Sequence, residues 1–305
     1  MRKKLNNLIA RSKKVTTSLV VLLVFLMPVF WTVNWGMQVF NSENKRKVFS
    51  LSELASFTAQ NCSSQSAELL KPFSEPIITV TFDDGWETAY SNSIEILENY
   101  CIKSTQYILG DHFNEQQYLS EEQVRSFKAL GHELAAHSMT HPDLTILSDE
   151  NLEWELAESK KLLEQKFGDI QEFATPLGAS NAKVNERIKK YFRSSRNTVG
   201  DPREGLDDSD INVKSTFDIY NINAFTVRKT TTVEELQALI DYTISRNGWL
   251  VITYHQVDDE NLSDYAVSPE VLESHMKLIA DKRIKNASIG NVLNAIEREN
   301  ETGSR

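Results

Sequence analysis

The chain has 305 residues, of which 40% are hydrophobic, and it carries a formal net charge of −10 from 33 basic and 43 acidic side chains. This length accommodates one large domain or two small ones. The composition is that of a globular protein and argues against a collagen-like, disordered or multi-span membrane protein. The net acidity also argues against a nucleic-acid partner, because contacts with phosphates require a basic surface.

The charge is distributed unevenly along the chain. Residues 1–14 contain six basic side chains and no acid, so the remaining residues sum to −16. No residue from Val15 to Ser42 is charged, and residues 19–33 read LVVLLVFLMPVFWTV. A transmembrane helix needs about 20 mostly apolar residues, and Trp31 and Trp35 suit the aromatic belt at a membrane surface. We therefore expect a cytoplasmic basic stub over 1–14 and a transmembrane signal anchor over 15–42.

By the positive-inside rule, such an anchor leaves the rest of the chain outside the cytoplasm. The alternative is a cleavable signal peptide, which has the same basic start but an apolar core of about 7–15 residues and a small-residue cleavage site. The apolar stretch here is longer, and no such site follows it clearly. The sequence thus favours a single-pass, membrane-anchored protein with an extracytoplasmic domain.

The next segment, residues 43–74, is polar and rich in Ser, Gln and Asn, and we interpret it as a stalk or N-terminal extension. It contains Cys62, and Cys101 is the only other cysteine of the chain. The two can pair in an oxidising compartment, but their sequence positions say little about geometry. A disulfide and two unpaired thiols therefore both stay open.

From residue 77 onward, short apolar runs alternate with helical patterns. Strands are expected over Ile77–Phe82, Thr105–Leu109, Glu133–Ala136, Glu172–Thr175, Phe192–Ser194, Ala224–Val227 and Trp249–Tyr254. Three helix starts stand between or after them: Ser148 as an N-cap, Thr232 with Glu235 as a capping box, and Pro269 in a first turn. This alternation predicts an α/β fold with parallel strands, either a barrel or an open sheet.

Reactive side chains directly follow three of the expected strands. Asp83 and Asp84 follow the run IITVTF, His137 and His141 belong to HSMTH after ELAA, and His255 follows WLVITY. In parallel α/β folds the active site lies at the C-terminal ends of the strands. We therefore expect these five residues to lie together in an enzyme site.

One carboxylate with two imidazoles is the ligand set of a catalytic metal centre, which keeps a coordination position open for water. The spacing of His137 and His141 suits a metal site on a helix or in a tight loop, and Pro142 favours the loop. An Asp-Asp pair alone is often only a turn, and two histidines alone are often surface residues. Their combination is more specific than either part.

These motifs resemble carbohydrate esterase family 4, the polysaccharide deacetylases that share the NodB-homology domain. The resemblance rests on TFDDG at 81–85, on HSMTH at 137–141 followed by PDLT, and on the late strand that ends in His255. It extends from about Glu75 to a C-terminal helix near Ile296. It implies a catalytic domain over 75–300 with a distorted (β/α) barrel of about seven strands, and a divalent metal, usually zinc, with cobalt or nickel as alternatives.

The resemblance also implies a role for each motif residue. Asp84, His137 and His141 would hold the metal. Asp83 would be the general base and His255 the general acid. This agrees with the chemistry, because a metal lowers the pKa of water until a carboxylate can take its proton, and an amine leaves only after it has been protonated.

The third motif departs from the family pattern. Family members often read RPPYG, whereas residues 173–178 read FATPLG. Ala174 occupies the position of the arginine that orients the catalytic aspartate, and Leu177 provides the backbone N–H expected to hold the oxyanion. Arg196 is our candidate for the missing cation beside Asp83. The alternative is an ordinary solvated surface arginine.

The resemblance implies a metal-dependent N-deacetylase that acts on an acetylated glycan such as peptidoglycan, a chitin-like oligomer or an N-acetylhexosamine exopolysaccharide. Trp86 is a candidate for lining the sugar cleft, with core packing as the alternative. An O-acetyl polysaccharide esterase would use the same machinery. The altered third motif also leaves open a degenerate glycan-binding module, although Asp83 and His255 are both retained. No serine-hydrolase elbow, P-loop or dinucleotide fingerprint is present.

Overall fold

The computed structural model describes residues 48–50, 52–53, 56, 69–198, 205–259 and 263–303. The stub and anchor expected over 1–14 and 15–42 lie outside these residues. Among the residues described, no helix combines the length and the apolar character needed to cross a bilayer. Cys101 is disulfide-bonded, and Cys62 lies outside the described residues.

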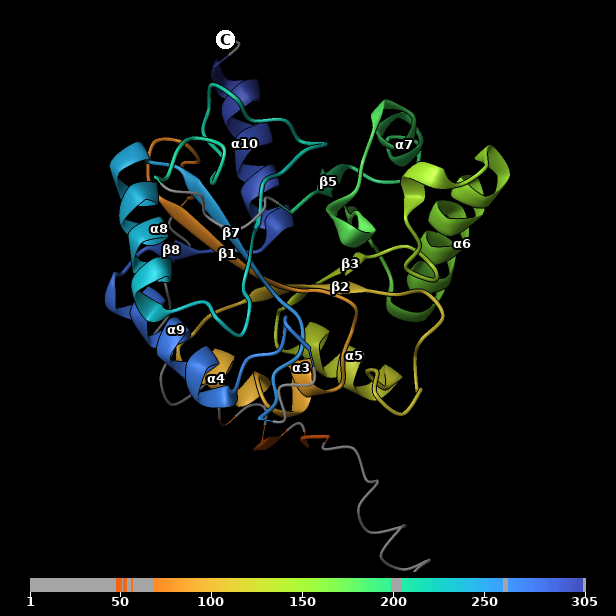
Figure 1. The fold of residues 1–305 in the computed structure, drawn as a ribbon, viewed down its shortest axis with the longest axis horizontal. Coiled ribbons are helices and arrows are strands. Elements are labelled where there is room, and N and C mark those ends of the chain that lie inside the picture. Colours follow the sequence, from red (N-terminus) through yellow and green to blue (C-terminus); the bar gives the residue numbers. More distant parts are fainter. Residues whose placement is uncertain are drawn as a thin grey trace, which may run out of the picture. The chain divides into compact units, whose positions relative to one another are not determined.

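The strands of the described residues form one parallel sheet (Figure 1). They are β1 (Ile77–Phe82), β2 (Ser104–Ile108), β3 (Glu133–Ala136), β4 (Glu172–Ala174), β5 (Ser194–Arg196), β6 (Phe225–Thr226), β7 (Trp249–Tyr254) and β8 (Lys285–Asn286). The order across the sheet is β5-β4-β3-β2-β1-β7-β6, and β8 also pairs with β1. The parallel α/β fold predicted from the sequence is confirmed.

The two edges of this sheet approach each other. Ile222, just before β6, donates its N–H to the carbonyl of Ser195 in β5 (3.0 Å), and the N–H of Asn197 donates to the carbonyl of Ile222 (2.9 Å). The described residues 205–224 between β5 and β6 contain no helix, whereas helices connect the other consecutive strands. The sheet therefore fits the expected distorted barrel, with its irregular seam between β5 and β6.

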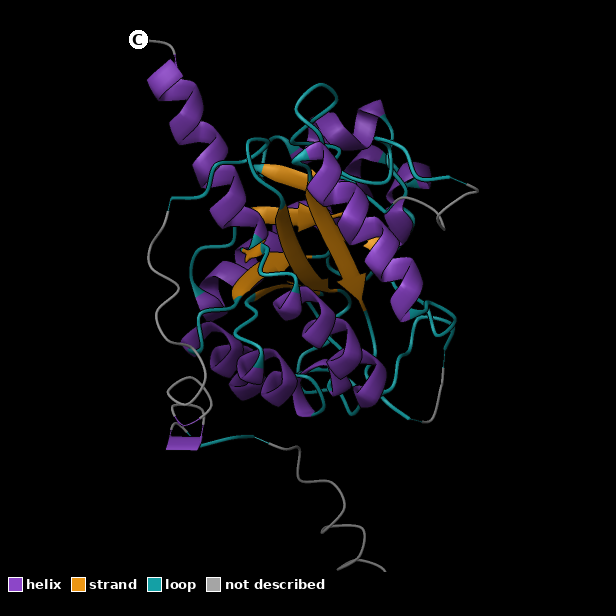
Figure 2. Ribbon diagram, turned by 90° about the vertical axis from the view of Figure 1, so that its left-hand side faces the viewer, coloured by secondary structure: helices purple, strands orange, loops and turns teal. Residues whose placement is uncertain are grey.

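Helices surround the sheet (Figure 2). They are α3 (Thr88–Ser91), α4 (Ile94–Asn99), α5 (Glu121–Ala129), α6 (Asp149–Phe167), α7 (Ala182–Ile188), α8 (Val233–Arg246), α9 (Pro269–Asp281) and α10 (Ile289–Gly303). The predicted helix starts are confirmed. Ser148 caps α6, the capping box of Thr232 and Glu235 opens α8, and Ser268 caps α9 ahead of Pro269.

The predicted bounds of β1, β3 and β7 are confirmed, but the position predicted for β5 is wrong by two residues. The N–H of Phe192 donates to the carbonyl of Ile188, so Phe192 still belongs to the turn that ends α7. Its ring packs against Phe173 with the ring centres 4.8 Å apart, which explains its apolar character. The shift makes Arg196 the last residue of β5 rather than part of a following loop.

The inner faces of the strands lead directly to the candidate site. One buried cluster includes Ile77, Tyr107 and Trp249 but no residue of the outer helices α3 to α9, so it fills the interior of the barrel. Because alternate residues of a strand share a face, Asp83 continues the inner face of β1 and His255 that of β7. The interior is therefore apolar at the N-terminal ends of these strands and polar at their C-terminal ends.

Helix α10 is attached at the end of the barrel opposite the candidate site. Its Gly290 N–H donates to the carboxylate of Glu133 (3.0 Å), and the hydroxyl of Thr105 donates to the same carboxylate (2.7 Å). A Cβ at position 290 would overlap Glu133 Oε1, so a larger residue there would displace this carboxylate. Burial raises the pKa of Glu133 to about 7, and the charge of Glu172 adds to this effect, while Gly290, Thr105 and Arg193 oppose it.

We therefore expect the free energy of unfolding to fall as the pH rises from about 4.5 to about 7. The folded state holds the Glu133 proton more tightly than the unfolded chain, so deprotonation costs stability, by at most about 3 kcal/mol. Glu133→Gln keeps an acceptor for Gly290 and should flatten this dependence, as measured by chemical denaturation at pH 5 to 8. The exposed Glu150→Gln variant should keep the wild-type slope. A Glu133→Gln slope equal to that of wild type would contradict the prediction.

Candidate active site

The residues expected in the site come from four strands and one turn. Asp83 and Asp84 follow β1, His137 and His141 follow β3, Arg196 ends β5, His255 follows β7, and Leu177 lies in the turn after β4. The Asp83 N–H donates to the carbonyl of Tyr254 (3.0 Å), which extends the β1–β7 pairing and brings Asp83 beside His255. The C-terminal edge of the sheet thus collects every one of these positions.

Asp84, His137 and His141 form a cluster of potential metal ligands. One ligand atom from each lies within 4.8 Å of the others. Asp84 Oδ1 is 3.4 Å from His137 Nε2 and 3.3 Å from His141 Nε2. This carboxylate oxygen is buried and has no hydrogen-bond partner in the described part of the chain.

The hydrogen bonds of His137 test whether the cluster suits a metal. Its Nδ1 lies 2.9 Å from the carbonyl oxygen of Ala174. A carbonyl only accepts, so Nδ1 carries the proton and Nε2 presents a lone pair toward Asp84. Two such lone-pair atoms at 3.4 Å require a positive charge between them. Three donors of this kind match the ligand set of catalytic zinc, so the residues fit a divalent metal.

The three side chains also shift one another's pKa values. Burial acts to raise the pKa of Asp84, but the neighbouring imidazoles, that of His137 first, hold that pKa well below its ordinary value. Burial acts to lower the pKa of His137, and the charges of Asp83 and Asp84 outweigh it, so the pKa is raised. Burial lowers the pKa of His141. The carboxylate is thus ionised and prepared for a cation.

The loop that carries the two histidines is held by a buried glutamate from α6. Glu155 accepts the N–H groups of Met139 (2.8 Å) and Thr140 (3.0 Å) and the hydroxyl of Thr140 (2.5 Å). The loop needs this support because Ser138 and His141 have positive φ values of 67° and 62°, which are costly for residues other than glycine. No sequence motif indicated Glu155, although a charge on the apolar face of an amphipathic helix was a usable signal.

Arg196 lies against Asp83. Its Nη2 is 2.5 Å from both carboxylate oxygens, and both side chains are buried. The guanidinium carbon is 4.8 Å from the ring centre of Tyr107, a residue that no sequence motif indicated. Arg193, by contrast, pairs with Glu172. The structure therefore brings Arg196 to the position that the third motif leaves without a cation.

His255 faces Asp83 from β7. Its Nε2 is 4.0 Å from Asp83 Oδ2. Its ring packs 5.0 Å from the ring of Tyr265, and the guanidinium of Arg228 lies 5.0 Å from that same tyrosine ring. Burial lowers the pKa of His255, opposed by Asp83 and Asp84. No sequence pattern indicated Tyr265, because it lies in an irregular loop.

Leu177 has a left-handed backbone conformation, which is unusual for a leucine. Its φ is 60°, a conformation that strains a bulky side chain. The side chain is 66% exposed, so packing does not account for the strain. Its N–H makes no hydrogen bond within the described residues and remains available to a substrate.

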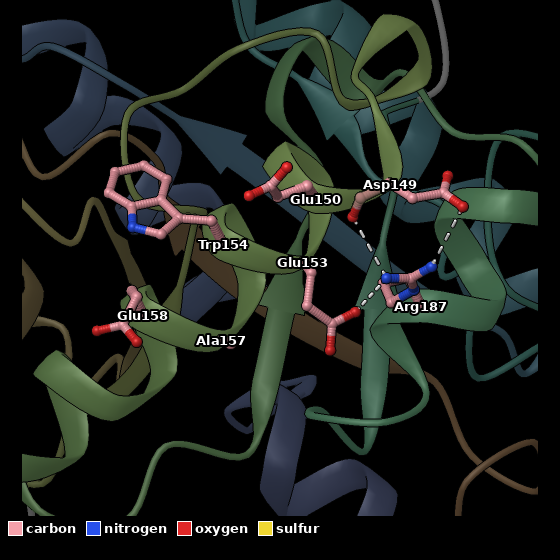
Figure 3. A pocket seen from close by; sticks show the side chains of 7 residues that line it. All are labelled: Asp149, Glu150, Glu153, Trp154, Ala157, Glu158 and Arg187. Atoms are coloured by element: carbon pink, nitrogen blue, oxygen red, sulfur yellow. Dashed lines mark hydrogen bonds and ion pairs between the residues drawn. The ribbon is translucent and has the colours of Figure 1, made fainter.

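A separate hollow of about 460 Å³ lies along α6 (Figure 3). It is lined by Trp154, by Arg187 of α7 and by acidic residues of α6. The acids are largely neutralised, since Asp149 and Glu153 pair with Arg187, and Glu158 pairs with Lys161. None of the candidate catalytic residues lines this hollow, so the chemistry belongs to the strand ends.

Comparison with known proteins agrees with the motif resemblance. Residues 71–192 match the family model described as polysaccharide deacetylase. The chain is 30% identical over 120 residues to the peptidoglycan-N-acetylglucosamine deacetylase of Bacillus cereus, covering 39% of this chain and 54% of that protein. It is 33% identical over 112 residues to the chitooligosaccharide deacetylase of Rhizobium leguminosarum bv. trifolii, covering 36% and 50%. The matches thus span about half the length of these curated relatives.

A solved structure supports the fold. The Xyl-CE4 domain of a multidomain xylanase from the hindgut metagenome of Trinervitermes trinervoides superposes with a TM-score of 0.51 at 19% identity, covering 74% of this chain and 92% of that domain. The family match includes the segments of Asp83–Asp84 and of His137–His141 and the altered third motif, whereas Arg196 and His255 lie beyond it. On the family match and the named relatives, residues 71–192 of this chain are similar to polysaccharide deacetylases, and the solved structure shares the fold.

Proposed function

We propose that this protein is a metal-dependent hydrolase that removes acetyl groups from an N-acetylated polysaccharide. The observation that carries the proposal is the convergence at one sheet edge of a potential metal-ligand cluster, a carboxylate and an imidazole. Asp84, His137 and His141 would hold the metal, most consistently zinc, with cobalt or nickel as alternatives. Asp83 Oδ2 lies 4.0 Å from both His137 Nε2 and His255 Nε2, and neither Asp83 nor His255 belongs to the cluster.

The bound metal would lower the pKa of water and polarise the acetyl carbonyl. Asp83 acts as the general base that takes the proton of the attacking water. Arg196 holds Asp83 by charge-assisted hydrogen bonds on both oxygens, so the carboxylate keeps a fixed orientation. The arginine of the usual third motif is thereby replaced by one from the next strand.

Release of the amine needs a proton donor, and the negative charge that develops on the acetyl oxygen needs a hydrogen-bond donor. His255 donates its proton to the departing amine nitrogen, which is a poor leaving group until protonated. The free N–H of Leu177 donates to the acetyl oxygen as it gains negative charge.

The proposal extends to substrate and location. Peptidoglycan and chitin-like oligomers are named as substrates in the relatives, and an N-acetylhexosamine exopolysaccharide has the same acetamide chemistry. The basic residues 1–14 and the uncharged stretch 15–42 support a membrane anchor with the catalytic domain outside the cytoplasm. The net charge of −16 beyond residue 14 disfavours an anionic polymer and suits a neutral glycan.

Acetate release tests the proposal. The zinc-loaded protein should release acetate from N-acetylglucosamine oligomers or peptidoglycan, and removal of the metal by a chelator should stop release. Asp83→Asn should keep about one metal per chain and lose at least about 100-fold in turnover, because general-base catalysis typically contributes about 10²–10⁴-fold. Metal analysis and an acetate assay measure the two effects separately.

The acetate assay, repeated with several acetylated glycans, also distinguishes the alternative functions. Release only from O-acetylated xylan would indicate an O-acetyl esterase. Zinc binding without acetate release from any acetylated glycan would indicate a binding module. Asp83→Asn with wild-type turnover would remove Asp83 from the mechanism.

A further inference from the structure

The two oxygens of the Asp84 carboxylate have different surroundings. Oδ1 faces His137 and His141 and has no hydrogen-bond partner among the described residues. Oδ2 accepts a hydrogen bond from the indole Nε1 of Trp86 at 2.9 Å. The indole N–H is a donor only, so it engages one oxygen and cannot itself act as a ligand.

The backbone turns so that this contact is possible. Asp84 has a φ of 69° and Gly85 a φ of 74°, so two successive left-handed residues directly precede Trp86. Such a turn folds the side chain of Trp86 back onto the carboxylate two residues earlier. A Cβ at position 85 would also lie only 3.3 Å from Ile108, which favours glycine there.

The indole is held from its other side. Its ring stacks on Tyr118 with the ring centres 4.8 Å apart and the planes 17° apart. Two backbone hydrogen bonds join the segment 85–87 to the segment 117–119. The N–H of Leu119 donates to the carbonyl of Gly85 (2.8 Å), and the N–H of Glu87 donates to the carbonyl of Gln117 (2.9 Å). The donor therefore has a fixed position before any ligand binds.

From these contacts we infer that Trp86 is a positioning residue for the metal ligand Asp84. Its N–H occupies Oδ2 and leaves Oδ1 as the single oxygen presented to the cation. This inference rests on the proposed metal site, and it differs from our sequence-based suggestion that Trp86 lines the sugar cleft. Hydrogen bonds to a ligating carboxylate typically change metal affinity by about 10–100-fold.

Zinc titration of the metal-free full chain tests the inference without substrate. Trp86→Phe keeps a ring to stack on Tyr118 but removes the N–H, and it should raise the Kd for zinc at least about 10-fold. Trp86→His keeps a ring N–H and should fall between wild type and Trp86→Phe. Trp154→Phe changes an exposed tryptophan on α6 (Figure 3) and should leave the Kd unchanged. The visible spectrum of the cobalt-loaded Trp86→Phe variant should also differ from that of wild type, because both oxygens become available.

Four results of the zinc titration would contradict the role inferred for Trp86. Equal zinc Kd values for Trp86→His and Trp86→Phe, or a Trp86→Phe value within twofold of wild type, would overturn the inference while leaving the proposed deacetylase intact. An equal rise in Trp154→Phe would also overturn it, since the effect would not be specific to Asp84. A wild-type chain that binds no zinc would overturn the proposed metal site and this inference together.

Discussion

Replacing Arg196 by Ala is expected to lower turnover about 100-fold and the free energy of unfolding by about 3–5 kcal/mol. The turnover falls because Asp83 loses the contacts that fix its orientation, and small misplacements of catalytic groups can cost about 10²-fold. The stability falls because a buried carboxylate is left without its partner. Acetate release and chemical denaturation of the same preparation measure the two losses.

Arg193→Ala is the matched control. Arg193 lies three residues earlier and pairs with the buried Glu172, so its removal should also cost stability. It is not in contact with Asp83, and its variant should keep turnover within about twofold of wild type after correction for the folded fraction. If Arg196→Ala lost only stability, as Arg193→Ala should, the arginine would have no part in orienting Asp83.

Glu155→Ala is expected to lower the free energy of unfolding by about 3 kcal/mol and to weaken zinc binding at least about 10-fold. The carboxylate of Glu155 accepts three hydrogen bonds from Met139 and Thr140. Hydrogen bonds to charged groups are worth about 1.5–3 kcal/mol each, but neighbouring losses do not add fully. His137 and His141 flank these residues, so a relaxed loop should separate the two ligands.

Glu155→Gln and Glu158→Ala complete the Glu155 experiment. The amide of Glu155→Gln keeps one acceptor oxygen, so its zinc Kd should lie between those of wild type and Glu155→Ala. Glu158 lies on the same helix, its side chain is 42% exposed, and it pairs only with Lys161 among the described residues. Its removal should change stability by less than about 0.5 kcal/mol. If Glu155→Ala lost stability but kept the wild-type zinc Kd, Glu155 would stabilise the fold without positioning His137 and His141.

Much of the site could be predicted from the sequence because its residues directly follow apolar strands. β1 and β7 are uninterrupted apolar or β-branched runs, and Asp83 and His255 stand where each run stops. The parallel arrangement then requires these ends to meet at one edge. The period of two along each strand also directs both side chains into the barrel.

The contacts between elements were not predictable in the same way. β8 has two residues, Lys285 and Asn286, with no strand pattern, and it pairs with the first two residues of β1, which β2 does not reach. The pairing of Arg196 with Asp83 depends on the order of five strands across the sheet. Tyr265 reaches His255 from a loop whose path no local signal indicates. Tertiary packing rather than local sequence decides such positions.

The pairing of β1 has a consequence for how the chain acquires its structure. β1 is hydrogen-bonded to β2, which follows it closely, and to β7 and β8, which are made last. The contact between Thr79 and Ala287 spans 208 positions. Pairings so distant in sequence slow folding, because a long loop must close before they form. The proposed metal ligands after β1 and β3 can therefore assemble early, whereas His255 takes its place only when the late strands close on β1.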